Sequence, residues 1–348
     1  MWTGDKELGI IFPLFLVPNP WYLIPDTAMN AQSLPILIVG SGAMACLFAA
    51  RLSAAGVPVM LLGNWPEAVK AIRRDGIRLL AADGSARAYP VQVINGLELS
   101  AEGPASDTVE LLAGVRYALV LVKSWQTGRA ACQLAACLPG DGLALTLQNG
   151  IGNRETLAAV LGEQRVFLGV TTAGATLVAP GCVRPAGMGS VTLDAGPRLA
   201  PLAAMLRAGG FSVDTVPDAD GLVWGKLVIS AAINPLTALF GIPNGELLSR
   251  EPARILLASA ALEAAAVAAA QGVQLPYPDP VAAVEKVARN TASNHSSMLQ
   301  DVQRGAPTEI DAICGAIVRA GQQSGIPTPV NNSLWQLVKT ISDKGIGA

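Results

Sequence analysis

The chain has 348 residues, of which 51% are hydrophobic and 14% are charged, and its formal net charge is −2. The length predicts about two domains, and a charge so close to zero argues against binding to nucleic acid. Five cysteines without a CxxC pair argue against a disulfide framework or a zinc site, and the single histidine argues against a histidine-rich metal site. We therefore expect a cytoplasmic protein that binds no metal.

Residues 1–33 do not follow the pattern of a folded segment. The apolar run from Ile11 to Val17 is far shorter than the ~20 residues of a membrane helix, and the segment is interrupted by Pro13, Pro18, Pro20 and Pro25. We expect this segment to be a disordered extension, and Met29 could be the true start. No later stretch is expected to span a membrane.

A glycine-rich loop follows the first apolar run. The run from Leu34 to Val39 predicts a buried strand, Cys46 to Ala55 a helix, and Pro58 to Leu62 a second strand. The GxGxxA loop between the first strand and the helix has the context of a dinucleotide-binding fingerprint, in which glycines allow a tight turn and close approach of the pyrophosphate. The residues predicted to bind the dinucleotide are Gly40, Ser41, Gly42, Ala43, Met44 and Ala45.

Further strands are expected at 117–122, 143–147, 166–170, 190–193 and 211–216, with helical segments between several of them. This order is typical of an open α/β sheet, in which ligands bind at the carboxyl ends of the strands. The loops at 123–127 and 148–150 follow two of these strands, so we expect both to face the cofactor.

From residue 218 the strand signals stop. Alanine-rich segments predict helices at 222–239, 252–271, 279–303, 307–323 and 331–341. The predicted fold is an α/β Rossmann-type dinucleotide-binding domain at 34–217, followed by an all-α domain at 218–345. Glu309 follows a proline and a threonine, so we expect it in the first turn of a helix, where the macrodipole favours a carboxylate.

One apolar stretch, 224–247, carries a lysine and several amides. Lys226, Ser230 and Asn234 are spaced to share one helix face, and Pro235 is expected to disturb or end that helix. Burial lowers the pKa of a lysine toward the range where it can give and take a proton. A lysine that only snorkels from a helix end remains the alternative.

Eight short motifs together resemble those of the ketopantoate reductase (2-dehydropantoate 2-reductase) family over residues 34–340. They read GSGAMA at 40–45, LVKSWQT at 121–127, LQNG at 147–150, WGKL at 224–227, INPLTAL at 233–239, PNGEL at 243–247, SSMLQD at 296–301 and TEID at 308–311. The resemblance implies a Rossmann domain and a helical domain with the substrate cleft between them. It also implies NADPH as hydride donor and reduction of ketopantoate to pantoate for pantothenate and coenzyme A synthesis.

The resemblance assigns roles to individual residues. Lys226 resembles the general acid, Lys123 and Ala175 fall at cofactor contacts, and Glu309 resembles the acid at the junction of cofactor and substrate. Asn149 looks like the residue beside both the nicotinamide and the substrate. The substrate-binding set implied in this way is Asn149, Lys226, Ser230, Asn234, Asn244 and Ser297.

Two positions depart from the family pattern. Ser230 stands where the family usually has an asparagine, and Asn64 stands where an arginine usually clamps the 2′-phosphate of NADPH. Arg73 and Arg74 could approach that phosphate instead. Ser230 motivates one alternative, a reductase of another branched 2-oxo acid. The glycine loop alone would also permit a non-catalytic nucleotide-binding regulatory protein. The sequence leaves both a monomer and a homodimer open.

Overall fold

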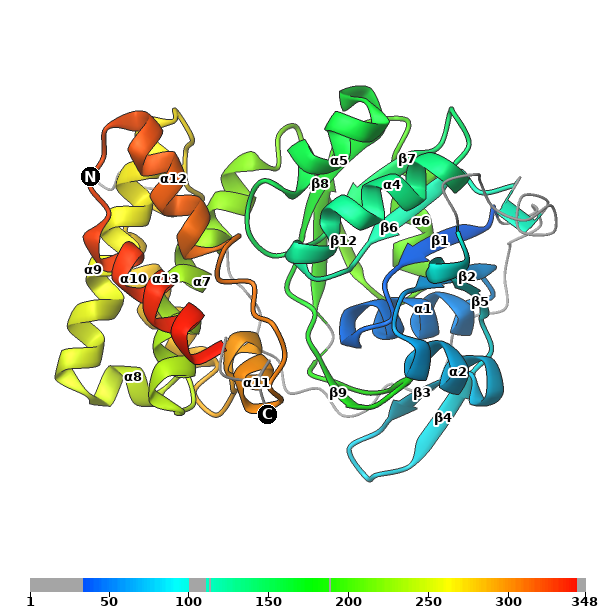
Figure 1. The fold of residues 1–348 in the computed structure, drawn as a ribbon, viewed down its shortest axis with the longest axis horizontal. Helices are drawn as coiled ribbons and strands as arrows, with labels where there is room; N and C mark the ends of the chain where they lie inside the picture. Colours follow the sequence, from blue (N-terminus) through cyan, green and yellow to red (C-terminus); the bar gives the residue numbers. More distant parts are fainter. Residues whose placement is uncertain (1–33, 100–110, 113, 188, 343–348) are drawn as a thin grey trace, which may run out of the picture. The chain divides into compact units, whose positions relative to one another are not determined.

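The computed structural model describes residues 34–342 apart from 100–110, 113 and 188 (Figure 1). The prediction of a disordered extension at 1–33 lies outside the described residues. Within 34–342, an α/β region built on a large sheet is followed by a region of helices, so the predicted fold class is confirmed.

The large sheet has eight strands in the order β12-β11-β8-β7-β6-β1-β2-β5. Every neighbouring pair is parallel except β8 and β11, which are antiparallel. The strands are β1 (Ile36–Val39), β2 (Val59–Gly63), β5 (Gln92–Asn95), β6 (Tyr117–Val120), β7 (Leu143–Thr146), β8 (Val166–Thr171), β11 (Ser190–Asp194) and β12 (Ser212–Val216).

Helices cover both faces of this sheet, which explains why its central strands are continuous apolar runs. In β1, Ile36 and Ile38 pack in one core with Phe48 of α1, and Leu37 and Val39 pack in the core on the opposite face. Burial of each such side chain contributes about 1.5–3 kcal/mol. The helices of this region are α1 (Ala43–Ala54), α2 (Pro66–Asp75), α4 (Thr127–Cys137), α5 (Asn153–Leu161) and α6 (Ala200–Ala208).

A second sheet of four strands was not expected from the sequence. Its order is β4-β3-β10-β9, formed by β3 (Ile77–Leu80), β4 (Ala86–Tyr89), β9 (Ala175–Ala179) and β10 (Cys182–Pro185). Three of the four residues of β4 are exposed, and none of β9 is buried. These strands therefore lack the apolar runs by which the strands of the large sheet could be recognised.

The helical region is α7 (Asp220–Phe240), α8 (Glu246–Ser249), α9 (Glu251–Ala270), α10 (Pro280–Asn290), α11 (Ser297–Gln303), α12 (Cys314–Ser324) and α13 (Pro329–Ser342). The single helix predicted at 279–303 is two helices, separated by 291–296. The helix predicted to begin at 307 begins at Cys314, so Glu309 lies in the turn before it and the expectation of a first-turn position was wrong.

Pro235 was expected to disturb or end α7, and it disturbs the helix without ending it. It lies inside the helix, which continues to Phe240. The proline ring cannot donate to the carbonyl of Ala231 one turn earlier. The Sγ atom of Cys314 lies 3.9 Å from that oxygen and offers it a weak donor, so neighbouring packing compensates in part for the missing backbone bond.

Two helices in the described part of the chain, α7 and α9, are long and apolar enough to cross a bilayer. The most apolar window of α7 is 61% buried inside the protein, and that of α9 is 39% buried. The core helix of a soluble protein passes the same test of length and composition. The expectation that no segment spans a membrane stays a prediction.

Candidate active site

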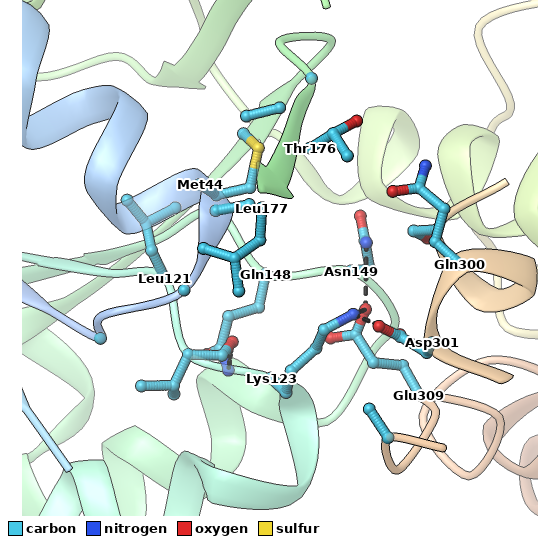
Figure 2. Close-up of a pocket in the computed structure, with 18 of the residues that line it drawn as sticks. Met44, Leu121, Lys123, Gln148, Asn149, Thr176, Leu177, Gln300, Asp301 and Glu309 are labelled. Carbon is cyan, nitrogen blue, oxygen red and sulfur yellow. Dashed lines mark hydrogen bonds and ion pairs between the residues drawn. The ribbon is translucent and has the colours of Figure 1, made fainter. Parts of the chain in front are cut away.

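A cavity of about 980 Å³ opens at the carboxyl ends of the parallel strands and is closed on its other side by α7, α11 and the turn before α12. Figure 2 shows part of its lining: apolar Met44, Leu121 and Leu177 gather on the side of α1, and polar side chains face them. The cavity brings together most of the residues predicted from the sequence. They are Gly40, Ser41, Gly42, Ala43, Met44, Lys123, Asn149, Ala175, Lys226, Ser230, Asn234, Ser297 and Glu309.

The glycine loop has the geometry that a dinucleotide needs. Gly40 has φ +126°, and a Cβ there would lie 3.2 Å from the backbone of Leu121. Gly42 is the N-cap of α1, and no described atom would come within 4 Å of a Cβ at this position, so the space above it is open. No side chain of the described residues caps α1, and its first turn holds no acid. These free N–H groups and the positive end of the helix dipole suit a pyrophosphate.

Glu309 ties the turn before α12 to two loops of the large sheet. Its Oε1 accepts a hydrogen bond from the backbone N–H of Ser124 at 3.1 Å, and its Oε2 accepts one from Nδ2 of Asn149 at 3.1 Å. The Nζ of Lys123 lies 3.6 Å from the same carboxylate (Figure 2). The side chain of Glu309 is only 6% exposed, so these three partners satisfy a buried charge.

Asp301 is a member of this cluster that the sequence reasoning missed. Its Oδ2 lies 2.6 Å from Nζ of Lys123, and its Oδ1 accepts a hydrogen bond from Arg304 at 2.8 Å. Burial alone lowers the pKa of Lys123, but the charges of Glu309 and Asp301 outweigh it and raise that pKa. Asp301 ends the SSMLQD motif, so the motif itself was the signal that could have identified it.

Lys226 lies on α7 and reaches toward the end of β8, where its Nζ donates a hydrogen bond to the carbonyl of Thr171 at 2.9 Å. Burial lowers the pKa of Lys226 to about 8, and the negative charge of Glu309 acts in the opposite direction. A pKa near neutrality allows the ammonium to give up a proton at physiological pH.

The polar face of α7 faces the same cavity. Ser230 and Asn234 follow Lys226 by one and two helical turns, and all three line the cavity. Ser297, the first residue of α11, lines the same cavity. That helix is fixed by its cap, Ser296, whose Oγ accepts hydrogen bonds from the N–H of Leu299 and from Thr237 of α7.

Two predicted residues do not line the cavity. Ala45 is fully buried in the core between α1 and the sheet. Asn244 lies in the turn after α7 and donates through Nδ2 to Oγ1 of Thr291 at 2.9 Å. Its Oδ1 is buried without a hydrogen-bond partner among the described residues. Its placement supports the segment 291–296 rather than the cavity wall.

That segment adds two lining residues, Asn294 and the single histidine, His295, for which the sequence predicted no role. Within the described residues, no group of three or more histidine, cysteine, aspartate or glutamate side chains is placed to hold a metal. The expectation of a metal-free site stays a prediction.

Comparisons with known proteins place the chain in a family. The model described as "Ketopantoate reductase PanE/ApbA" matches residues 36–198, and the one described as "Ketopantoate reductase PanE/ApbA C terminal" matches residues 218–342. A 2-dehydropantoate 2-reductase of Halobacterium salinarum is 34% identical over 89% of this chain and 99% of its own length.

Two solved structures are similar over nearly the same range. A PanE/ApbA family ketopantoate reductase from Ralstonia eutropha JMP134 has a TM-score of 0.79 at 34% identity, covering 90% of this chain and 99% of that one. D-mandelate dehydrogenase, solved with NADH and anilino(oxo)acetate, has a TM-score of 0.80 at 26% identity with the same coverage. The glycine loop, the lysine of α7 and these matches over both regions agree: the chain belongs to the ketopantoate reductase family.

Proposed function

We propose that this chain is a 2-dehydropantoate 2-reductase, which uses NADPH to reduce the ketone of 2-dehydropantoate to the alcohol of pantoate. The observation that carries the proposal is that a half-buried lysine with a pKa of about 8 and an uncapped Gly-rich helix start line one cavity. A ketone reduction needs a hydride donor and a proton donor, and the cavity has a place for both.

The start of α1 supplies the dinucleotide site in this proposal. The pyrophosphate would be held by the backbone of the glycine loop, which comprises Gly40, Ser41, Gly42, Ala43 and Met44, with Ala45 packed beneath. Lys123, Asn149 and Ala175 would line the path toward the reacting end. When bound there, NADPH supplies the hydride that adds to the carbonyl carbon of the substrate.

Lys226 is the proposed general acid. Hydride addition places negative charge on the carbonyl oxygen, and the Nζ of Lys226 donates its proton to that oxygen, which leaves a neutral amine that solvent reprotonates. Its present partner is only a neutral backbone carbonyl, that of Thr171, so substrate can replace it without breaking an ion pair.

The substrate would be held by the polar face of α7 and by α11. Ser230, Asn234 and Ser297 offer hydrogen bonds to its hydroxyl and carboxylate groups, and Asn149 lies near the junction with the cofactor. Glu309 holds Asn149 and Lys123 in place. Asn244 lies outside the cavity wall, so its position does not support a direct contact with the substrate.

A second candidate substrate is another branched 2-oxo acid. Ser230 is shorter than the asparagine usual in the family and leaves more room beside Lys226. D-mandelate dehydrogenase, a structural neighbour, was solved with a different oxo acid, anilino(oxo)acetate, and with NADH. The third alternative, a non-catalytic regulatory protein, has no need for Lys226 and the polar face of α7.

One assay separates these alternatives. Purified protein is mixed with NADPH or NADH and a panel of 2-oxo acids, and loss of the reduced nicotinamide absorbance is followed. The proposal predicts the highest kcat/KM with 2-dehydropantoate. A higher value for another acid supports the second candidate, and nucleotide binding without any turnover supports the third. Three further expectations stay predictions. They are the domain limits of 34–217 and 218–345, the cytoplasmic location, and assembly as a monomer or homodimer.

A further inference from the structure

Four cationic side chains line the cavity: Lys123, Arg129, Lys226 and Arg304. Lys123 and Arg304 both bind Asp301, and Lys226 donates to a backbone carbonyl. Arg129 is exposed and has no hydrogen bond or ion pair with any residue that the structure describes. It is therefore a positive charge at the cavity wall that the fold itself does not use.

The position of Arg129 follows from the helix that carries it. Arg129 lies in the first turn of α4, and Gln133 lies one turn further along the same face. The amide of Gln133 exchanges two hydrogen bonds with that of Asn64, at 3.0 and 2.7 Å. This face of α4 therefore lies against the residue that follows β2, and Arg129 lies about 6 Å further toward the start of the helix, where it lines the cavity.

The residue after β2 cannot select the cofactor by charge. In dinucleotide folds an acid near this point binds the 2′-hydroxyl of NAD, whereas a nearby arginine accommodates the 2′-phosphate of NADP. Asn64 is neutral, and both ends of its amide are bonded to Gln133. The next two residues, Trp65 and Pro66, also line the cavity and are uncharged.

Two other arginines near β2 are less suited to this role. Arg73 donates from Nε and Nη2 to the carbonyl of Val93, and Arg74 forms an ion pair with Asp75 at 2.7 Å. Both belong to the lining of a separate, smaller cavity of about 410 Å³ along α2. Neither lines the cavity that contains the glycine loop.

We propose that the guanidinium of Arg129 recognises the 2′-phosphate of NADPH, so that α4 rather than the end of β2 determines cofactor choice. The proposal rests on the proposed function, since it assumes that NADPH enters this cavity. A planar guanidinium matches two phosphate oxygens at once, and an arginine without a competing carboxylate is free to form both bonds.

Binding measurements test this without turnover. Calorimetric titration compares adenosine 2′,5′-bisphosphate with adenosine 5′-monophosphate, and NADPH with NADH, because the members of each pair differ only in the 2′-phosphate. Arg129→Gln should weaken binding of the two 2′-phosphorylated ligands by about tenfold or more, and change the other two by less than about twofold. Arg129→Lys should recover part of the loss, since it keeps the charge but not the fork.

Two further variants make the result specific. Arg289→Gln removes an exposed arginine of α10 that does not line the cavity, and should leave all four affinities unchanged. Arg73→Gln tests the rival position. An equal loss for all four ligands in Arg129→Gln would mean that Arg129 only packs on the adenosine, and would overturn the proposal. An unchanged ratio of NADPH affinity to NADH affinity in Arg129→Gln would also overturn it. So would a loss of that preference in Arg73→Gln instead. The proposed function is tested separately, by turnover of a 2-oxo acid by the wild-type protein. None of these binding results changes that turnover, so failure of this proposal is distinct from failure of the proposed function.

Discussion

Asn149 donates a hydrogen bond from Nδ2 to Oε2 of Glu309 at 3.1 Å, across 160 positions of sequence. Asn149 belongs to the loop after β7, and Glu309 to the turn before α12, so the bond joins the large sheet to the helical region. The backbone supports the same junction, because Ile151 donates its N–H to the carbonyl of Ala312 at 3.2 Å. The arrangement of the candidate site depends on this contact between the two regions.

The charge of Glu309 should be visible in the pH profile. Glu309 opposes the effect of burial on Lys226, so its removal should lower the pKa of Lys226 below its present value of about 8. A general acid must be protonated, and activity therefore falls as pH rises through its pKa. In Glu309→Gln, the alkaline limb of kcat/KM should move to lower pH.

The matched control is Asp311→Asn, which removes an exposed carboxylate two residues later that binds Trp335. Its alkaline limb should stay where the wild type has it. A limb that does not move in Glu309→Gln, or that moves equally in both variants, would show that Glu309 is not coupled to the proton donor.

A glycine pair tests the backbone part of the junction. Gly150 has φ +84° and Gly152 has φ +90°. An alanine at either position would therefore introduce backbone strain of about 1–2 kcal/mol. Only at Gly150 would the new Cβ also run into the carbonyl of Ala312, whereas no described atom lies within 4 Å at Gly152. Gly150→Ala should therefore lower the free energy of unfolding by about 1–3 kcal/mol more than Gly152→Ala does.

Urea denaturation of the two variants measures this difference. Gly150→Ala should also raise KM, because it displaces the loop that carries Asn149. Equal losses of stability in the two variants would mean that Ala312 moves aside at little cost, and that the junction is not rigid.

The glycine loop can be tested without disturbing the fold. The backbone of Gly42 has φ −82°, and no described atom lies within 4 Å of a Cβ built there, so Gly42→Val should fold normally. The valine would occupy space that the pyrophosphate is expected to fill, and NADPH binding should weaken by about 1.4 kcal/mol or more, a factor of ten.

Gly196→Val is the control for this substitution, because Gly196 has similar free space and does not line the cavity. Calorimetric titration with NADPH measures both variants. Wild-type affinity in Gly42→Val would place the cofactor elsewhere than at the start of α1.

Some of the fold and site could be read from the sequence because the information is local. The strand at Ile36–Val39 is buried from both faces and therefore appears as a plain apolar run before the glycine loop. Lys226, Ser230 and Asn234 share a helix face by their spacing alone. The exposed strand β4 carries no such run, so the small sheet could not be recognised.

Other features depend on contacts between distant residues. The ion pair of Lys123 and Asp301 spans 178 positions, and the amide pair of Asn64 and Gln133 spans 69. The local rule for proline could not decide whether Pro235 ends the helix or only disturbs it, because the contact with Cys314 comes from a distant part of the chain. Such pairings arise from the packing of elements and have no local sequence signal.

The central claim is that Lys226 donates the proton. Lys226→Ala should lower kcat by roughly 10²–10⁴-fold, the usual contribution of a general acid. NADPH affinity should hardly change, because the glycine loop and Arg129 lie on other elements. The pH profile distinguishes a proton donor from a merely structural lysine.

The most direct measurement is therefore the pH dependence of kcat for wild type and Lys226→Ala, with saturating NADPH and 2-dehydropantoate. The wild type should lose activity on the alkaline side as Lys226 deprotonates near pH 8, and the variant should be slow at every pH without that limb. A variant with near-normal kcat, or one that keeps the wild-type alkaline limb, would contradict the account and leave Lys226 as a lysine that only fills its place on α7.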